Sequence, residues 1–159
     1  MVKAIKGAAV LFSVASMLSF STSLYAEEQS GKQIFATCSA CHLSTGEGIP
    51  GAFPPLTKLP EIYQQEGGKQ YLISVVLQGL SGPITSQGNA FSGYMQAFGT
   101  SLSDSEIASV LNYVLNNIPK PSSGEISPVL DSDVSVVRAK IAQGEMENSH
   151  TLRKSLTTP

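Results

Sequence analysis

The stretch FATCSACH, residues 35–42, holds both cysteines of the 159-residue chain and one of its two histidines. The thiols of Cys38 and Cys41 are three positions apart, and the imidazole of His42 follows directly. Upstream, residues 27–37 are a short helical candidate, which places the two thiols near the end of a helix. The group that these two thiols and the imidazole bind, or the bond that they form, therefore decides how the rest of the chain folds.

This C-x-x-C-H pattern is the attachment signature of a c-type haem. Two thiols at this spacing can each add to one vinyl group of the same porphyrin, and the adjacent imidazole is then held under the iron as an axial ligand. The sequence therefore predicts one covalently bound haem c, attached through Cys38 and Cys41, with His42 as an iron ligand.

A disulfide or a zinc site would account for less of the pattern. A thioredoxin-type disulfide needs a βαβ context, and the sequence lacks one. A zinc site needs four ligands, whereas the chain offers Cys38, Cys41, His42 and the remote His150. A plain structural disulfide leaves His42 without a role. The haem interpretation is favoured because it uses all three groups.

The first 26 residues have the features of an export signal. Lys3 and Lys6 form a positively charged N-terminal region, residues 8–20 are apolar or small, and residues 21–26 provide a cleavage region. We expect cleavage after Ala26 and location in a bacterial periplasm, with an uncleaved anchor as the alternative. In an oxidising compartment such as the periplasm, two free cysteines normally form a disulfide unless they are bonded to another group.

The composition excludes several function classes. With 42% hydrophobic and 14% charged residues the chain is globular. A formal net charge of −2 gives no basic patch for nucleic acid. The sequence shows no Ser/His/Asp arrangement, paired acid and base, or phosphate loop. We therefore expect no catalysis of bond chemistry and no small-molecule substrate.

The hydrophobic pattern predicts helices and no strands. The best candidate begins at a capping box formed by Ser103 and Glu106 and is stopped by Pro119. Its apolar positions recur at helical spacing: Ile107, Val110, Leu111, Val114, Leu115 and Ile118. Shorter helices are predicted over residues 60–65 and 69–78, the second ending at Gly79.

Between these helices, residues 45–59 and 80–100 are rich in Gly and Pro, which predicts long irregular loops. Beyond residue 120, a linker over 121–124 and a short helical candidate over 132–143 precede a polar, unpatterned stretch that predicts a mobile tail. The expected organisation is a cleaved signal over 1–26, a single-haem domain over 27–120 and a C-terminal extension over 121–159.

The second axial ligand has to come from a distant part of the chain. Met1 and Met17 lie in the predicted signal and Met146 in the tail, which leaves Met95 in the second Gly-rich loop. A lone Met more often fills a core. However, a loop this long in a small domain is usually functional, and His150 as ligand would require the tail to fold back. Met95 is therefore the predicted ligand.

In the order of these features the chain resembles the class I c-type cytochromes, in their bacterial periplasmic single-haem branch, over about residues 28–118. The motif CSACH, residues 38–42, matches the haem-binding motif, and FSGYM, residues 91–95, resembles the stretch that leads to the Met ligand. The resemblance implies an all-α fold whose N- and C-terminal helices cross around the haem, with Gly31 and Tyr113 at the crossing.

The same resemblance gives Pro54, in Pro54-Pro55-Leu56, a role in orienting His42 through its carbonyl group. A plain loop proline is the alternative. It further implies that the protein is not an enzyme but an electron carrier that cycles between Fe(II) and Fe(III).

Its expected partners are periplasmic redox proteins: a dehydrogenase, a reductase or a terminal oxidase. One alternative is an electron-accepting subunit of a dehydrogenase or reductase complex, docked through residues 121–159. A haem sensor or peroxidase-like protein is less favoured, because it requires that Met95 is not a firm ligand. The sequence leaves open the redox partner, the direction of electron flow, the potential, and whether the protein is a monomer or a complex subunit.

Overall fold

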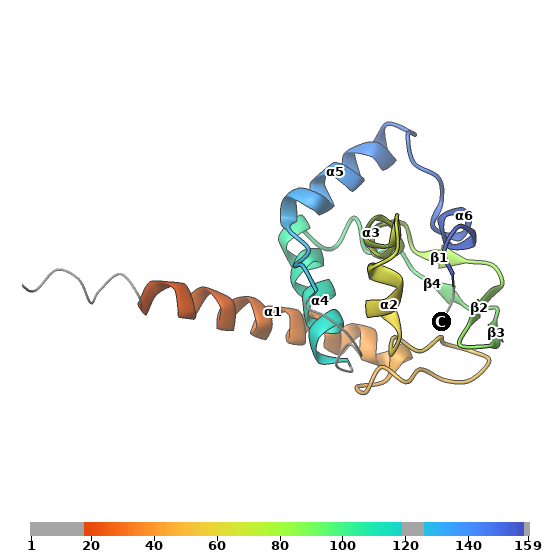
Figure 1. Ribbon diagram of the computed structural model, residues 1–159, viewed down its shortest axis with the longest axis horizontal. Helices are drawn as coiled ribbons and strands as arrows, with labels where there is room; N and C mark the ends of the chain where they lie inside the picture. Colours follow the sequence, from red (N-terminus) through yellow and green to blue (C-terminus); the bar gives the residue numbers. More distant parts are fainter. Residues whose placement is uncertain (1–17, 119–125, 158–159) are drawn as a thin grey trace, which may run out of the picture.

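The computed structural model describes residues 18–118 and 126–157, with side chains from residue 30 onward. Most of the predicted export signal (1–17), the predicted helix stop at Pro119 and the predicted linker (121–124) lie outside the described residues, and cleavage after Ala26 stays a prediction. The helices and strands, shown in Figure 1, are α1 (Leu18–His42), α2 (Leu59–Tyr63), α3 (Gly68–Gln78), β1 (Leu80–Ser81), β2 (Ile84–Ser86), β3 (Asn89–Phe91), β4 (Tyr94–Met95), α4 (Asp104–Asn117), α5 (Asp131–Ala142) and α6 (Ser149–Lys154).

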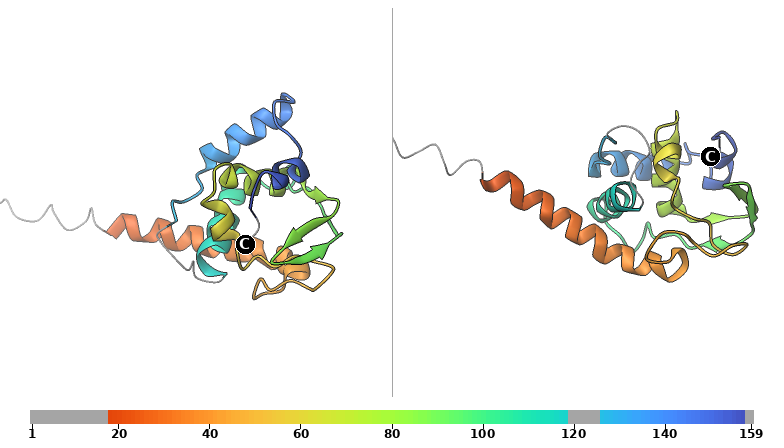
Figure 2. Two further views of the ribbon diagram at one scale, coloured as in Figure 1. Left: turned by 45° about the vertical axis from the view of Figure 1, so that its right-hand side comes forward. Right: turned by 60° about the horizontal axis from the view of Figure 1, so that its bottom comes forward.

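Helices α1 and α4 cross, as Figure 1 and Figure 2 show, and the crossing depends on a glycine. A Cβ atom on Gly31 would lie 2.3 Å from the carbonyl oxygen of Ser109 and 2.8 Å from Cβ of Tyr113. One turn further along α1, the ring of Phe35 packs against Tyr113 with 5.5 Å between centroids. The predicted crossing of the N- and C-terminal helices of the domain is confirmed, with Gly31 and Tyr113 in contact.

Helix α1 is longer than the predicted span of residues 27–37. It continues through the CSACH motif to His42, because no Gly or Pro interrupts residues 32–42. The chain then turns at Leu43, which has a positive φ of 62°, and at Gly46, with φ of 71°. Both thiols and the imidazole are therefore on the last turns of a helix, which fixes their relative positions.

The predicted capping box at the start of α4 is present. The Ser103 Oγ accepts from the backbone N–H of Glu106 at 3.3 Å, and the Glu106 carboxylate accepts from the backbone N–H of Ser103 at 2.8 Å. The apolar stripe of this helix is buried along its whole length: Ile107, Val110, Leu111, Val114, Leu115 and Ile118. Sequence patterning alone therefore located this helix and its buried face.

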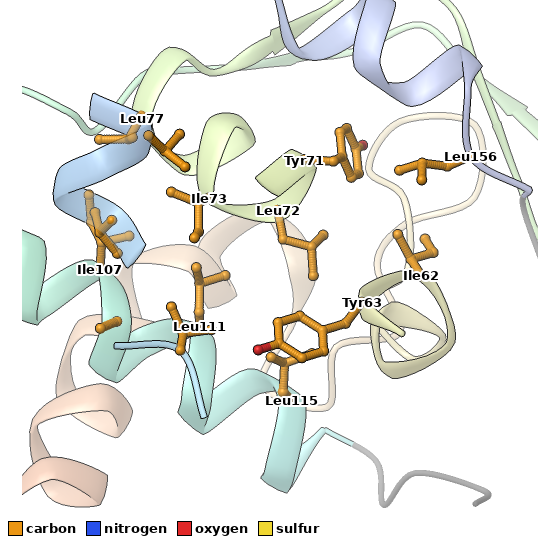
Figure 3. Packing of buried hydrophobic residues seen from close by; sticks show 14 residues of the cluster. Ile62, Tyr63, Tyr71, Leu72, Ile73, Leu77, Ile107, Leu111, Leu115 and Leu156 are labelled. Atoms are coloured by element: carbon orange, nitrogen blue, oxygen red, sulfur yellow. The ribbon is translucent and has the colours of Figure 1, made fainter. Parts of the chain in front are cut away.

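The core lies where α2, α3 and α4 meet, as the close view in Figure 3 shows. Helix α3 spans Gly68–Gln78, and the predicted cap Gly79 follows it with a positive φ of 75°, a backbone conformation that favours glycine. The buried residues labelled in the figure are Ile62, Tyr63, Tyr71, Leu72, Ile73, Leu77, Ile107, Leu111, Leu115 and Leu156.

The loop of residues 80–100 is not wholly irregular, so the expectation of no strands was wrong. Strands β1 and β4 pair antiparallel with Leu80 opposite Met95, and β2 and β3 pair with Ile84 opposite Phe91. Each strand has only two or three residues, too few for an alternating pattern to be recognised in a sequence. The fold remains the helical one predicted, with two short ribbons added.

The C-terminal extension is also more ordered than predicted. The candidate over 132–143 is α5, and residues 144–159, expected to be an unpatterned mobile tail, contain α6. This helix contacts α3 and β1, and Arg153 and Leu156 are buried. A helix of six residues is too short to show a periodic stripe, which explains why the sequence did not reveal it.

Specific polar contacts attach the extension to the domain. The amide of Asn112 in α4 donates to the carbonyl of Val129 at 2.9 Å and accepts from its N–H at 2.8 Å. Arg138 in α5 forms a 2.7 Å ion pair with Asp104. Within the described residues, the structure has no helix long and apolar enough to cross a membrane.

Candidate functional site

His42 is buried at the end of α1, with 8% of its surface exposed. Its Nδ1 lies 2.9 Å from the carbonyl oxygen of Pro54. Because a carbonyl can only accept, Nδ1 carries the proton and Nε2 keeps a free lone pair for a metal. Burial lowers the pKa of His42, and the Pro54 carbonyl opposes this shift. The site therefore favours a neutral imidazole, the form that binds iron.

The two cysteines have different surroundings, although both thiols are free. Cys38 is half-buried and its Sγ lies 4.0 Å from the carbonyl oxygen of Ile34, whereas Cys41 is exposed. Burial raises the pKa of the Cys38 thiol. Residues three apart on a helix lie on one side of it. Both cysteines therefore line the same hollow, the half-buried Cys38 from its interior and the exposed Cys41 from its rim.

That hollow consists of two adjoining cavities of about 340 and 360 Å³. Most of their walls are apolar side chains from α1, α3, α4 and the ribbons. Eight residues line both cavities: Thr37, Cys38, His42, Pro54, Leu80, Ile84, Met95 and Phe98. Cys41 lines the second. The five predicted site residues are thus gathered around one apolar space.

Met95 is half-buried in β4, far along the chain from His42. Its pairing with Leu80 fixes it to the end of α3. Gly79 makes this approach possible, because a Cβ there would lie 2.4 Å from the Met95 carbonyl oxygen. The next segment is tied to α3 as well, since the N–H of Phe98 donates to the Val76 carbonyl at 2.9 Å. Met95 therefore has a fixed position on the cavity wall.

The other candidate ligands are engaged elsewhere. The tail does fold back, contrary to expectation, but His150 bonds to the carbonyl of Pro83 through Nε2 at 2.9 Å. The sulfur of Met146 lies 3.0 Å from the Ser74 hydroxyl. Over residues 18–118 and 126–157, no three His, Cys, Asp or Glu side chains are grouped so that they could hold a metal ion. This finding gives the zinc alternative no support.

Sequence reasoning missed one polar residue of the site. Arg153 of α6 is 6% exposed and lines the first cavity together with His42 and Met95. An isolated cation in a polar tail normally indicates a solvated side chain. No pattern in the sequence distinguished it from its neighbour Lys154.

These features define a small helical protein built around a large apolar cofactor space, with two thiols, an imidazole and a thioether on its walls. The cytochrome c family matches residues 28–117, so the chain belongs to the cytochrome c family. Its cofactor is covalently attached haem c, and CSACH fits the attachment motif of that cofactor.

The chain is similar to two curated proteins. A cytochrome c-552 of Thermus thermophilus is 49% identical over 85 residues, which are 53% of this chain and 64% of that protein. A second cytochrome c-552, from the Thermus thermophilus strain ATCC 27634, is also 49% identical over 85 residues, covering 53% of this chain and 57% of the relative. The chain thus matches less than two thirds of either relative's length.

The residues present fit haem c on structural grounds as well. The apolar cavities suit a porphyrin face, and the thiols stand on one helix beside an imidazole whose pKa is lowered by burial. In addition, the Nη1 atom of Arg153 is buried without a hydrogen-bond partner at the first cavity. A donor in this position is expected where a cofactor brings acceptor atoms of its own.

Proposed function

We propose that this chain is a periplasmic electron carrier whose haem iron is bound by His42 and Met95 and cycles between Fe(II) and Fe(III). The observation that carries the proposal is the placement of both side chains on the walls of the same two cavities. Their positions are held independently, His42 by the Pro54 carbonyl and Met95 by its pairing with Leu80.

Each residue has a separate task in this proposal. Cys38 and Cys41 hold the cofactor covalently, His42 binds from α1 with the free Nε2, and Met95 binds from β4. The haem would supply a one-electron couple, and with His42 and Met95 both bound to its iron it would leave no coordination position for a substrate. The apolar walls exclude water, and together with a thioether ligand they favour a higher reduction potential than two nitrogen ligands would give.

Electron exchange requires that part of the cofactor comes near the surface. Cys41, one of the two attachment points, is exposed. We therefore place the docking region for a periplasmic redox partner around this residue. A small interface suits a carrier that must bind briefly and leave.

Spectra of the purified, matured protein test this proposal. We expect a Met-sulfur to Fe(III) charge-transfer band in the far red for the oxidised form. We expect no carbon monoxide binding by the reduced form at neutral pH. Ready carbon monoxide binding together with absence of the band would overturn the Met95 assignment and favour a sensor or peroxidase-like protein.

The subunit alternative assigned residues 121–159 to docking. Two of these residues, Arg153 and Leu156, are instead buried within the chain itself, so the extension has a role without a partner protein. Size-exclusion chromatography of the native protein from periplasmic extract distinguishes the two cases. A carrier elutes at its own size, whereas a complex subunit co-elutes with a larger flavin, quinone or metal enzyme.

A further inference from the structure

The guanidinium group of Arg153 is buried at the wall of the first cavity with one side incompletely bonded. Its Nη2 donates to the carbonyl oxygen of Thr85 at 3.2 Å. Its Cζ lies 5.6 Å from the centre of the Tyr71 ring. Its Nη1, buried as well, has no hydrogen-bond partner. The group is thus oriented on two sides and lacks an acceptor on the third.

Leaving such a group unpaired is costly. A buried donor without a partner loses the free energy of its bonds to water, and the loss is greater when the group is charged. Guanidinium groups pair best with carboxylates, through parallel N–H donors. Among the described residues that line either cavity, none is Asp or Glu. The missing acceptor therefore has to arrive with the bound molecule.

From these observations we infer that Arg153, on α6 of the C-terminal extension, binds a propionate carboxylate of the haem. The inference rests on the haem site proposed above and adds a contact from outside the region that matches the family, which ends at residue 117. Among the described Lys and Arg residues, Arg153 is the one that lines these cavities. The extension thereby becomes part of the cofactor site.

The surroundings of Arg153 suit this role. Burial raises the pKa of Tyr71 to about 12, so this neighbour stays neutral and does not compete as an anion. The Tyr71 ring is on α3 and Thr85 is on β2, so Arg153 is held by two separate elements. The guanidinium group therefore has its orientation before the cofactor binds, which lowers the entropic cost of the contact.

The test compares holoprotein variants at this position. Arg153→Gln removes the charge, Arg153→Lys keeps it without the forked donors, and Lys154→Gln is the matched control on the exposed neighbour. The readouts are the midpoint potential and the propionate bending bands of the resonance Raman spectrum. We expect Arg153→Gln to lower the potential, because a nearby cation stabilises Fe(II) relative to Fe(III). The expected shift corresponds to roughly a tenfold change in the equilibrium constant for reduction, as for one unit charge about 12 Å from the iron at an effective dielectric constant of about 20.

The Lys154→Gln control should leave both readouts at wild-type values, and Arg153→Lys should keep most of the potential while shifting the Raman bands. An Arg153→Gln holoprotein with intact Met ligation but wild-type potential and bands would overturn the inference and leave the proposed function standing. If Arg153→Gln yields no holoprotein, the comparison of Arg153→Lys with the wild type tests the inference. Unchanged propionate bending bands in Arg153→Lys would show that Arg153 does not bind a propionate carboxylate, and would overturn the inference. Failure of the wild-type chain to hold haem would instead overturn the proposed function.

Discussion

The Nδ1 atom of His42 lies 2.9 Å from the carbonyl oxygen of Pro54, twelve residues further along the chain. This bond fixes the orientation of the ring and selects the tautomer whose Nε2 is free. Pro54 and Pro55 restrict the backbone that presents the carbonyl. The loop after α1 therefore orients the His42 ring, which is the geometry that the predicted role of Pro54 requires.

We predict that the haem is attached through both cysteines. Intact-mass analysis of matured protein should show one haem per chain, and the pigment should stay with the polypeptide after denaturation. Cys38→Ser or Cys41→Ser leaves at most one thioether and should reduce the yield of holoprotein markedly, whereas Ser44→Ala on the exposed turn beyond the motif should not. Bare polypeptide after maturation by a competent host would contradict the haem assignment.

We predict that Met95→Ala abolishes the far-red sulfur-to-iron band and lowers the reduction potential, because a strong thioether ligand is lost. The reduced variant should also bind carbon monoxide. The matched control is Met146→Leu, since Met146 contacts Ser74 and the core. That variant should lose some stability and keep the band. If Met95→Ala retains both band and potential, another residue is the ligand.

Local chemistry explains why much of the site could be predicted. The CSACH motif needs no tertiary information, because the thiols and the imidazole are neighbours on one helix. Helix α4 is likewise recognisable from its capping box and a complete apolar stripe. Gly31 could be assigned to a helix crossing only through the family resemblance, and the close approach to Ser109 gives that assignment a physical basis.

Contacts between distant segments could not be predicted. The pairing of Leu80 with Met95 involves strands of two residues, which leave no period in the sequence. Arg153 could not be recognised for a different reason: the groups that contact its guanidinium, the Tyr71 ring and the Thr85 carbonyl, are distant from it in the sequence. The burial of a single cation of this kind can be recognised only in the folded structure.

Gly31→Ala should destabilise the holoprotein. On an exposed helix this change stabilises, by up to about 1 kcal/mol. Here the new Cβ meets the backbone oxygen of Ser109, which cannot rotate away, so α1 and α4 must separate. We expect a loss of about 1–3 kcal/mol in the free energy of unfolding, the usual cost of overpacking. Urea denaturation measures it, with Lys32→Ala at the exposed neighbouring position as the control.

The attachment of α5 should depend on pH through Asp133. Its Oδ2 accepts from Lys69 Nζ on α3 at 2.6 Å and from the N–H of Leu130 at 2.9 Å. The bond from Lys69 and then that from Leu130 lower the pKa of this carboxyl group. A carboxylate stabilised in the folded state contributes stability above its unfolded pKa of about 3.9 and loses it as pH falls through the lower folded value.

Asp133→Asn should therefore cost about 0.5–1 kcal/mol of unfolding free energy at pH 7, a modest amount because the pair is partly solvated. The difference from wild type should shrink as the pH is lowered below 4 and vanish once Asp133 is protonated in both states. Asp131→Asn, exposed in the first turn of the same helix, is the matched control and should show a smaller difference at pH 7. A difference for Asp133→Asn that stays constant into the acid range would mean that packing, rather than the ion pair with Lys69, attaches α5 to α3.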